Sequence, residues 1–157
     1  MYKRQVRALL PLGSLTIFAG TAATASGPHA GGAGTGDVID RLEFKGIETL
    51  EWVVQRHSAF ATLLGIAVIC VFFLIRRRGG DRRAQRPLVV VGCLLAAQGV
   101  LGITQYRLEL PSELVWIHVA LAVATWSALL WSVATAGRLQ PSPVSSRLTD
   151  RPDPQPV

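Results

Sequence analysis

The chain has very little cysteine, and this scarcity excludes several kinds of chemistry. Among its 157 residues there are two cysteines, Cys70 and Cys93. They are too far apart to form a Cys-x-x-Cys pair, so the sequence gives no support for a redox dithiol. Both lie inside apolar stretches, where we expect them to be small buried apolar side chains.

Charge is also missing from four long stretches, and this excludes an ordinary soluble domain. Residues 8–25, 58–75, 87–104 and 114–136 contain no Asp, Glu, Lys or Arg, and each stretch has 18 to 23 residues. Half of the chain is apolar and its mean hydropathy is +0.37. A bilayer core needs about 20 helical residues to cross it. We therefore expect membrane spans at about 8–25, 53–75, 87–106 and 114–136.

The fold class follows from the bilayer. Backbone groups in lipid must be hydrogen-bonded within their own segment, so uncharged stretches of this length are helices. The sequence predicts an all-α membrane protein, an up-down bundle of four transmembrane helices over residues 1–137. Residues 138–157 are rich in Pro, Ser and Arg, and we expect them to form a disordered cytoplasmic tail. Residues 1–25 also resemble a cleavable signal peptide, whose removal would leave three spans in the same orientation.

Acidic residues are fewer than basic ones, 10 against 16, and the basic residues are unevenly placed. Cytoplasmic loops hold the excess of Lys and Arg, so we expect a multi-pass protein of the cell membrane with both termini in the cytoplasm. The net charge of +6 is explained by this topology, and we expect the lipid bilayer rather than nucleic acid as partner. Twelve basic residues fall on the expected cytoplasmic side: Lys3, Arg4, Arg7, Arg76, Arg77, Arg78, Arg82, Arg83, Arg86, Arg138, Arg147 and Arg151.

Histidine is uncommon in membrane spans, where an ionisable residue points to a functional site. His57 begins the second span and His118 lies near the start of the fourth. Both helices run in the same direction, so the two imidazoles are expected at similar depth and on facing helices. This is how a bundle holds a heme iron from both sides. Without a Cys-x-x-Cys-His motif, covalent attachment is unsupported.

Two other interpretations of the histidines stay open at this point. Each could make an unrelated interhelical hydrogen bond, or the pair could belong to a zinc site, although no third ligand is evident at that depth. Arg56 and Arg107 lie at the outer boundary of the spans. They are candidates to pair with heme propionates, or they serve as interfacial anchors.

Three stretches resemble the C-terminal half of the heme A synthase family. The third combines a Gln-Gly-x-x-Gly-x-x-Gln-Tyr run, a Leu-Pro turn and a His, and the resemblance extends from about residue 5 to 137. The residues that carry it are Thr24-Ala25-Ser26-Gly27-Pro28-His29-Ala30-Gly31, Gln55-Arg56-His57, and Gln98 to Tyr106 followed by Leu110-Pro111 and Val115-Trp116-Ile117-His118.

The resemblance implies a membrane heme protein that contributes to the oxidation of heme O to heme A for cytochrome oxidase. In that family the C-terminal half is taken to bind a heme b, so His57 and His118 would be its axial iron ligands. The N-terminal half of the family is missing here. An oxidoreductase activity would therefore need a partner half or a homodimer, and the catalytic residues are unknown.

Several alternatives remain at the level of sequence. The chain could be a non-catalytic membrane subunit or assembly factor, or a b-type electron-transfer cytochrome. Glu51 is a conceivable acid at the outer face, or a solvated charge. His29 either lies near the heme edge or is solvated in its Gly-rich loop.

Overall fold

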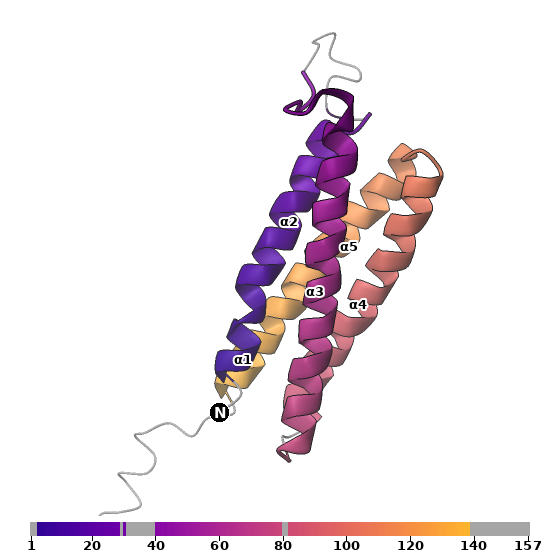
Figure 1. Ribbon diagram of the computed structural model, residues 1–157. Helices are drawn as coiled ribbons and strands as arrows, with labels where there is room; N and C mark the ends of the chain where they lie inside the picture. The colour runs from indigo at the N-terminus through magenta and orange to yellow at the C-terminus, as the bar shows by residue number, and fades with distance from the viewer. Residues whose placement is uncertain (1–2, 29, 31–39, 80–81, 139–157) are drawn as a thin grey trace, which may run out of the picture.

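The computed structural model describes residues 3–28, 30, 40–79 and 82–138, and this part of the chain is helical with no strand (Figure 1). The expected spans 53–75, 87–106 and 114–136 each lie within one long helix, and the span 8–25 falls on α2 and the residue before it. The elements are α1 (Lys3–Arg7), α2 (Leu9–Ser26), the 3-10 turn η1 (Gly46–Glu48), α3 (Thr49–Arg77), α4 (Arg82–Arg107) and α5 (Ser112–Arg138).

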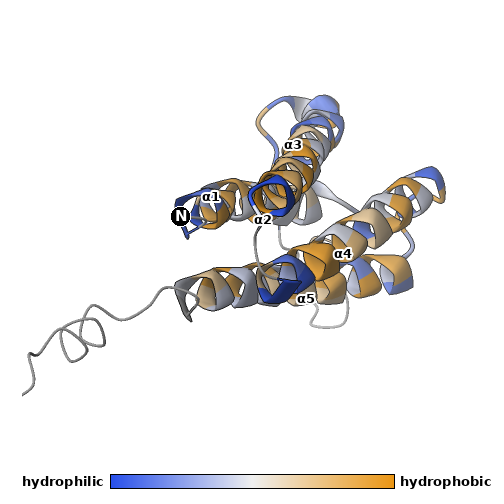
Figure 2. Ribbon diagram, turned by 90° about the horizontal axis from the view of Figure 1, so that it is seen from below, coloured by the Kyte–Doolittle hydropathy of each residue, from blue (hydrophilic) through white to orange (hydrophobic). Residues whose placement is uncertain are grey.

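The helices form an up-down bundle in two layers. Helix α2 packs chiefly on α3, and α4 chiefly on α5. Figure 2 shows the two pairs as separate layers when the bundle is viewed from its lower end. In the part of the chain that the structure describes, four helices are long and apolar enough to cross a membrane, with α1 and α2 counted as one. The predicted fold class, a four-helix membrane bundle, is confirmed, and the chain is a multi-pass membrane protein.

A proline explains why the first span is divided into α1 and α2. Pro11 has no backbone N–H, so it cannot donate to the carbonyl of Arg7, where α1 ends. The interruption is local, because Ala8 keeps helical backbone angles and its N–H donates to the carbonyl of Arg4 at 3.0 Å. The chain therefore continues in nearly the same direction through the break.

The hydrophobic core fills only one end of the bundle, the end near the chain's N-terminus. Within the described chain, no residue of α4 after Val91 and no residue of α5 before Thr125 is buried. The two helix pairs therefore pack tightly at this end and diverge toward the other, as Figure 1 shows. The buried residues that form the core are Val6, Leu9, Leu64, Val68, Ile75, Ala84, Leu88, Val91, Ala128, Leu129 and Ala136.

The connection from α4 to α5 is a short turn with unusual backbone angles. Glu109 and Leu110 have φ of 60° and 62°, which are left-handed conformations that residues other than glycine rarely adopt. The Leu110 N–H donates to the carbonyl of Gln105 at 2.7 Å and closes the end of α4. Pro111 follows and disfavours a right-handed helical conformation at Leu110. The turn therefore reverses the chain and sets α5 antiparallel to α4.

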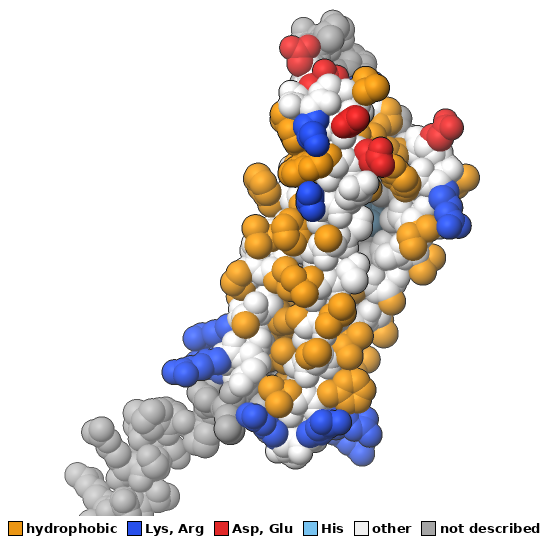
Figure 3. All heavy atoms as spheres, in the orientation of Figure 1, with side chains coloured by type: hydrophobic (Ala, Val, Ile, Leu, Met, Phe, Trp, Pro, Cys, Tyr) orange, Lys and Arg blue, Asp and Glu red, His pale blue; other side chains and the backbone are white. Residues whose placement is uncertain are grey.

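The two ends of the bundle differ in charge: only Lys and Arg are seen at the lower end, whereas acidic and basic side chains are mixed at the upper end (Figure 3). The lower end in that view carries Lys and Arg from the start of α1 and from the α3–α4 connection. The acidic side chains gather at the upper end, on the segment before α3 and around the α4–α5 turn. The two ends are therefore a basic end and an acidic end, the names used below.

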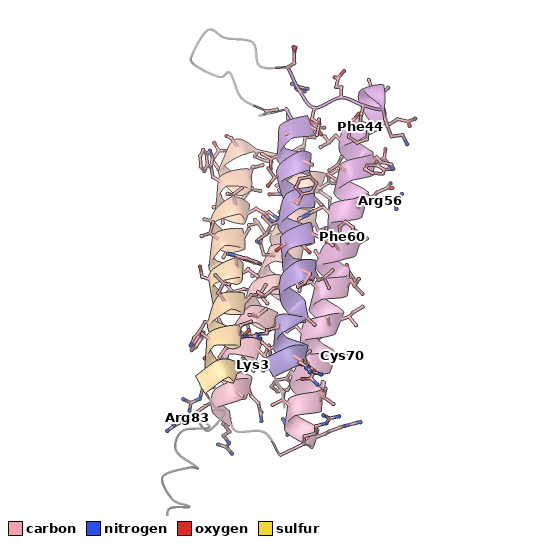
Figure 4. The ribbon with its side chains drawn as sticks, turned by 90° about the vertical axis from the view of Figure 1, so that its left-hand side faces the viewer. Lys3, Phe44, Arg56, Phe60, Cys70 and Arg83 are labelled. Carbon is pink, nitrogen blue, oxygen red and sulfur yellow. The ribbon has the colours of Figure 1, made fainter. Side chains whose placement is uncertain are left out.

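The expectation that the cysteines are buried is wrong. Cys70 and Cys93 are both exposed on the surface of their helices, and Cys70 is labelled on α3 in Figure 4. The reason is that lipid replaces water around a membrane bundle. A thiol there meets an apolar environment on the outside as well as the inside, so no burial is required.

Candidate functional site

The structure brings His57 and His118 together from two helices that are diagonal in the bundle. Their ring centres lie 6.2 Å apart, and the ring planes are inclined at 68°. His57 comes from the third turn of α3 and His118 from the second turn of α5, and both helices begin at the acidic end. The two imidazoles therefore meet between the helix pairs, in the half of the bundle that the core does not fill.

His57 is held against α2. Its Nδ1 atom lies 2.9 Å from the backbone carbonyl oxygen of Thr16. A carbonyl only accepts, so Nδ1 carries the proton and Nε2 has a free lone pair. Gly20, one turn further along α2, makes this approach possible, because an added Cβ would lie 2.9 Å from Cε1 of His57. The orientation of this ring is thus set by the backbone of a different helix.

His118 packs on α4 in a similar way. An added Cβ at Gly102 would lie 3.4 Å from its Cε1 atom, so the ring rests on the glycine backbone. The side-chain Nε2 of Gln98 donates to the backbone carbonyl of His118 at 3.2 Å. The Nδ1 atom of His118 is buried without a hydrogen-bond partner among the described residues. It is a polar atom that the described protein groups leave unsatisfied.

Three glycines of α3 and α4 have open space beside them. Added Cβ atoms at Gly65, Gly92 and Gly99 would meet no atom within 4 Å. In the space-filling view, pale-blue histidine atoms are visible in a furrow toward the acidic end (Figure 3). A flat group could therefore approach the imidazoles without displacing a packed core.

The spacing of the two rings fits a shared metal ion. A metal–nitrogen bond of about 2.0 Å on each side, with each ring centre about 1.1 Å beyond its nitrogen, separates two axial imidazoles by about 6 Å. The observed 6.2 Å agrees with this value. Within the described ranges, no cluster of three or more His, Cys, Asp and Glu residues that would suit a metal is present. A two-ligand axial arrangement therefore fits the residues better than a tetrahedral site.

Comparison with known proteins adds independent information on identity. The cytochrome oxidase assembly protein family matches residues 17–154, from within α2 to beyond the end of α5. The chain belongs to this family. Neither a comparison with curated proteins nor one with solved structures found a match. The sequence resemblance to heme A synthases agrees with the family, which is that of a membrane protein of cytochrome oxidase assembly.

Arg56 and Arg107, the two candidates to pair with heme propionates, lie at the acidic end of the bundle. The Arg56 guanidinium is 5.0 Å from the ring centre of Trp52, and the side chain is exposed on the outer side of α3 (Figure 4). Lys45 approaches the same ring at 5.9 Å, and Phe44 meets it edge-on at 5.4 Å. Arg107 is exposed at the last position of α4. Arg56 therefore packs with Trp52 and is not brought into contact with the histidine pair.

The two remaining candidates are Glu51 and His29. Glu51 is exposed, and one of its carboxylate oxygens accepts a hydrogen bond from Gln55 at 3.3 Å within the first turns of α3. Its position fits a solvated charge. His29 lies outside the described residues.

Sequence reasoning missed the groups that hold the rings in place. The backbone carbonyl of Thr16 could not be predicted as an acceptor from the sequence, because every residue has a backbone carbonyl. Gly20 is one of several small residues in the first span and was not singled out. Gln98 and Gln105 were seen only as parts of a motif. Two glutamines seven residues apart in an apolar span, with glycines between them, are the sequence signal that could have revealed Gln98 and Gln105.

Proposed function

We propose that this chain binds a heme b, with His57 and His118 as the two axial iron ligands. One observation carries the proposal: imidazoles from two diagonal helices lie with their ring centres 6.2 Å apart in the part of the bundle that the core leaves open. The hydrogen bond from Nδ1 of His57 to Thr16 supports it, because this bond places the proton on Nδ1 and leaves the lone pair of Nε2 free to bind a metal.

The chain's own contribution is ligation, burial and orientation. A heme bound here would supply one-electron redox chemistry, with a potential set by its ligands and surroundings. His57 is fixed by the backbone of α2, and His118 is supported by Gly102 and Gln98 of α4. The His57 ring is therefore anchored to α2 by a hydrogen bond, whereas the His118 ring rests on α4 and the hydrogen bond from Gln98 holds its backbone.

In the cell this heme protein contributes to the oxidation of heme O to heme A for cytochrome oxidase. Family membership and the heme A synthase resemblance support this role. In this role the chain acts with a protein that supplies the N-terminal half of the family's fold, or as a homodimer. The acidic end, which holds the pair, faces the extracytoplasmic side of the cell membrane, and both termini are cytoplasmic.

Arg56 and Arg107 pair with the heme propionates in this proposal. Both are exposed at the acidic end, where propionates would reach the membrane surface. Arg56 would have to leave the face of Trp52, 5.0 Å away, or bind while stacked on it. A guanidinium suits either arrangement, since it stacks on an aromatic face and still presents donors in its plane.

Heme binding is tested by difference spectroscopy on the chain purified in detergent. Wild type should show the low-spin b-type band in reduced-minus-oxidised spectra, and His57→Ala and His118→Ala should lose it. Matched controls are Ser58→Ala and Val119→Ala, which change the exposed neighbours of the two ligands. A wild type without the band, or a full-strength band in His118→Ala, would contradict the proposal.

The role in heme A formation needs a separate experiment. The chain is co-expressed with a source of heme O, with and without a protein supplying the missing four-helix half, and the extracted hemes are separated by chromatography. Heme A that appears only when this chain is present supports the role. Bound heme b without any heme A would indicate an electron-transfer cytochrome, and unchanged heme A on deletion of the chain would indicate a non-catalytic subunit.

A further inference from the structure

One face of α4 forms a cradle for His118. Gln98, Gly102 and Gln105 are spaced at i, i+4 and i+7, so they lie on the same side of the helix. The imidazole rests on Gly102, which lies between Gln98 and Gln105 along this face of α4. The side-chain oxygens of both glutamines and Nδ1 of His118 are buried without a hydrogen-bond partner among the described residues.

Three unsatisfied polar atoms on one face require an explanation. A buried polar atom without a partner costs about 1–3 kcal/mol, so native structures pair nearly all of them, often through ordered water. Two of the three are acceptors only. Nδ1 of His118 is the single atom among them that can carry a proton and donate it. The complementary arrangement is a protonated Nδ1 facing a glutamine oxygen.

The direction of the side chains selects Gln105 rather than Gln98. Each Cα–Cβ bond of a helix tilts toward its N-terminus. In α5 this tilt carries the His118 ring toward the acidic end, whereas in α4 it carries both glutamines toward the basic end. Gln105 therefore leans back to the level of Gly102 and the ring. Gln98 lies below that level, where its Nε2 already donates to the His118 carbonyl.

We propose that Gln105 is the positioning residue of His118. Its Oε1 accepts, through one ordered water, the proton on Nδ1 of the imidazole. This fixes the tautomer with Nδ1 protonated and leaves the Nε2 lone pair free toward the space shared with His57. The role as heme ligand rests on the proposed function, but the tautomer and its dependence on Gln105 are properties of the chain without heme.

His57, the other proposed ligand, has its Nδ1 atom paired in a different way. Nδ1 of His57 is paired directly with a backbone carbonyl. Nδ1 of His118 has no hydrogen-bond partner among the described residues. In the proposal, the side-chain amide of Gln105 supplies the acceptor through the ordered water. Outer partners of this kind raise the basicity of an imidazole ligand and hold its plane.

The first test uses the full chain without heme, with ¹⁵N-labelled histidine, in detergent at mildly alkaline pH. His118→Ala assigns the His118 signals. Wild type should show His118 with the proton on Nδ1, and Gln105→Leu should shift the ring toward the tautomer protonated on Nε2. Gln105→Glu keeps an acceptor of similar size and should retain the wild-type tautomer. A wild-type His118 protonated on Nε2 would overturn the proposal, because it would mean that the amide nitrogen faces the ring.

The second test uses the heme-loaded chain and its midpoint potential. Gln105→Leu should shift the potential to more positive values and weaken heme retention about 10-fold or more. Gln105→Glu should shift it to more negative values, because a carboxylate is the stronger acceptor. Thr104→Val is the matched control, since this exposed neighbour bonds only within its own helix, to the carbonyl of Val100. A purely structural Gln105 would give loss of heme in both variants without opposite shifts, and that result would overturn the proposal.

The two tests separate this inference from the proposed function. A wild type that binds no heme would contradict the proposed function, while the tautomer measurement would still decide the role of Gln105. A wild type that binds heme, with an unchanged tautomer and potential in Gln105→Leu, would overturn the inference alone.

Discussion

The imidazole of His57 in α3 donates from Nδ1 to the backbone carbonyl of Thr16 in α2, at 2.9 Å. The two residues are 41 positions apart, and the bond joins two neighbouring helices of the bundle. Since the acceptor is backbone, no side-chain substitution at Thr16 removes it directly. The orientation of His57 depends on the packing of α2 against α3, and small residues on α2 control this packing.

Replacement of Gly20 is expected to displace His57. The Cβ of Gly20→Ala would lie 2.9 Å from Cε1 and 3.2 Å from Nδ1 of His57, so the ring or the helix must move. Overpacking of this kind costs about 1–3 kcal/mol. We expect Gly20→Ala to bind heme about 10-fold more weakly than wild type in a titration followed by absorbance.

Two other glycines provide the controls for Gly20→Ala. An added Cβ at Gly102 would meet His118 at 3.4 Å, an ordinary contact, so Gly102→Ala should have a smaller effect. At Gly65 there is open space, and Gly65→Ala should bind heme as wild type does. Equal losses of heme affinity in all three variants would show that any side chain added to these helices weakens binding. The contact with His57 would then not be the specific cause.

Thr49 is expected to hold the segment that precedes α3. Its buried hydroxyl accepts from the N–H groups of Lys45 and Phe44 at 2.9 and 3.2 Å and donates to the carbonyl of Gly46 at 2.8 Å. Thr49→Val keeps the shape and removes these bonds. Loss of about 1 kcal/mol should speed hydrogen exchange at the Lys45 and Phe44 amides about fivefold or more. Thr21→Val is the control, since this exposed hydroxyl bonds only to Ile17 of its own helix.

Glycine at position 109 should stabilise the bundle. Glu109 has φ of 60°, a conformation that costs a residue with a Cβ about 1–2 kcal/mol. Glycine avoids this strain but loses more entropy on folding. Glu109→Gly should therefore raise the free energy of unfolding by about 0.5–1 kcal/mol. Thermal unfolding in detergent should show a raised midpoint. Glu113→Gly, in the first turn of α5, should lower it, and the same direction in both variants would contradict the argument.

The proposed orientation in the membrane predicts which end of the bundle a membrane-impermeant thiol reagent reaches from outside the cell. In a background with Cys70→Ala and Cys93→Ala, Leu108→Cys at the α4–α5 turn should be labelled in intact cells. Gly79→Cys, after α3 at the basic end, should be labelled only after the membrane is opened. The reverse pattern would place the histidine pair on the cytoplasmic side.

Much of the fold was predictable because its determinants are local. Uncharged stretches of 18 or more residues specify membrane helices, since no other structure satisfies the backbone in lipid. The depth of His57 and His118 follows from their distances to the starts of two helices that run in the same direction. Burial was less predictable, as the exposed Cys70 and Cys93 show, because an apolar side chain in a membrane helix can face either lipid or protein.

The sequence by itself determined four membrane helices, their alternating directions and two histidines at one depth, because length, charge and spacing along a helix decide these. Only the tertiary structure decided that the core occupies the basic end and that the acidic end stays open between the helix pairs. It also decided that Thr16 and Gly20 orient one ring while Gly102 and Gln98 support the other. The physical reason is that these contacts join different helices. How closely α2 approaches α3, and α4 approaches α5, depends on the packing of all four helices together and is not encoded in any single span.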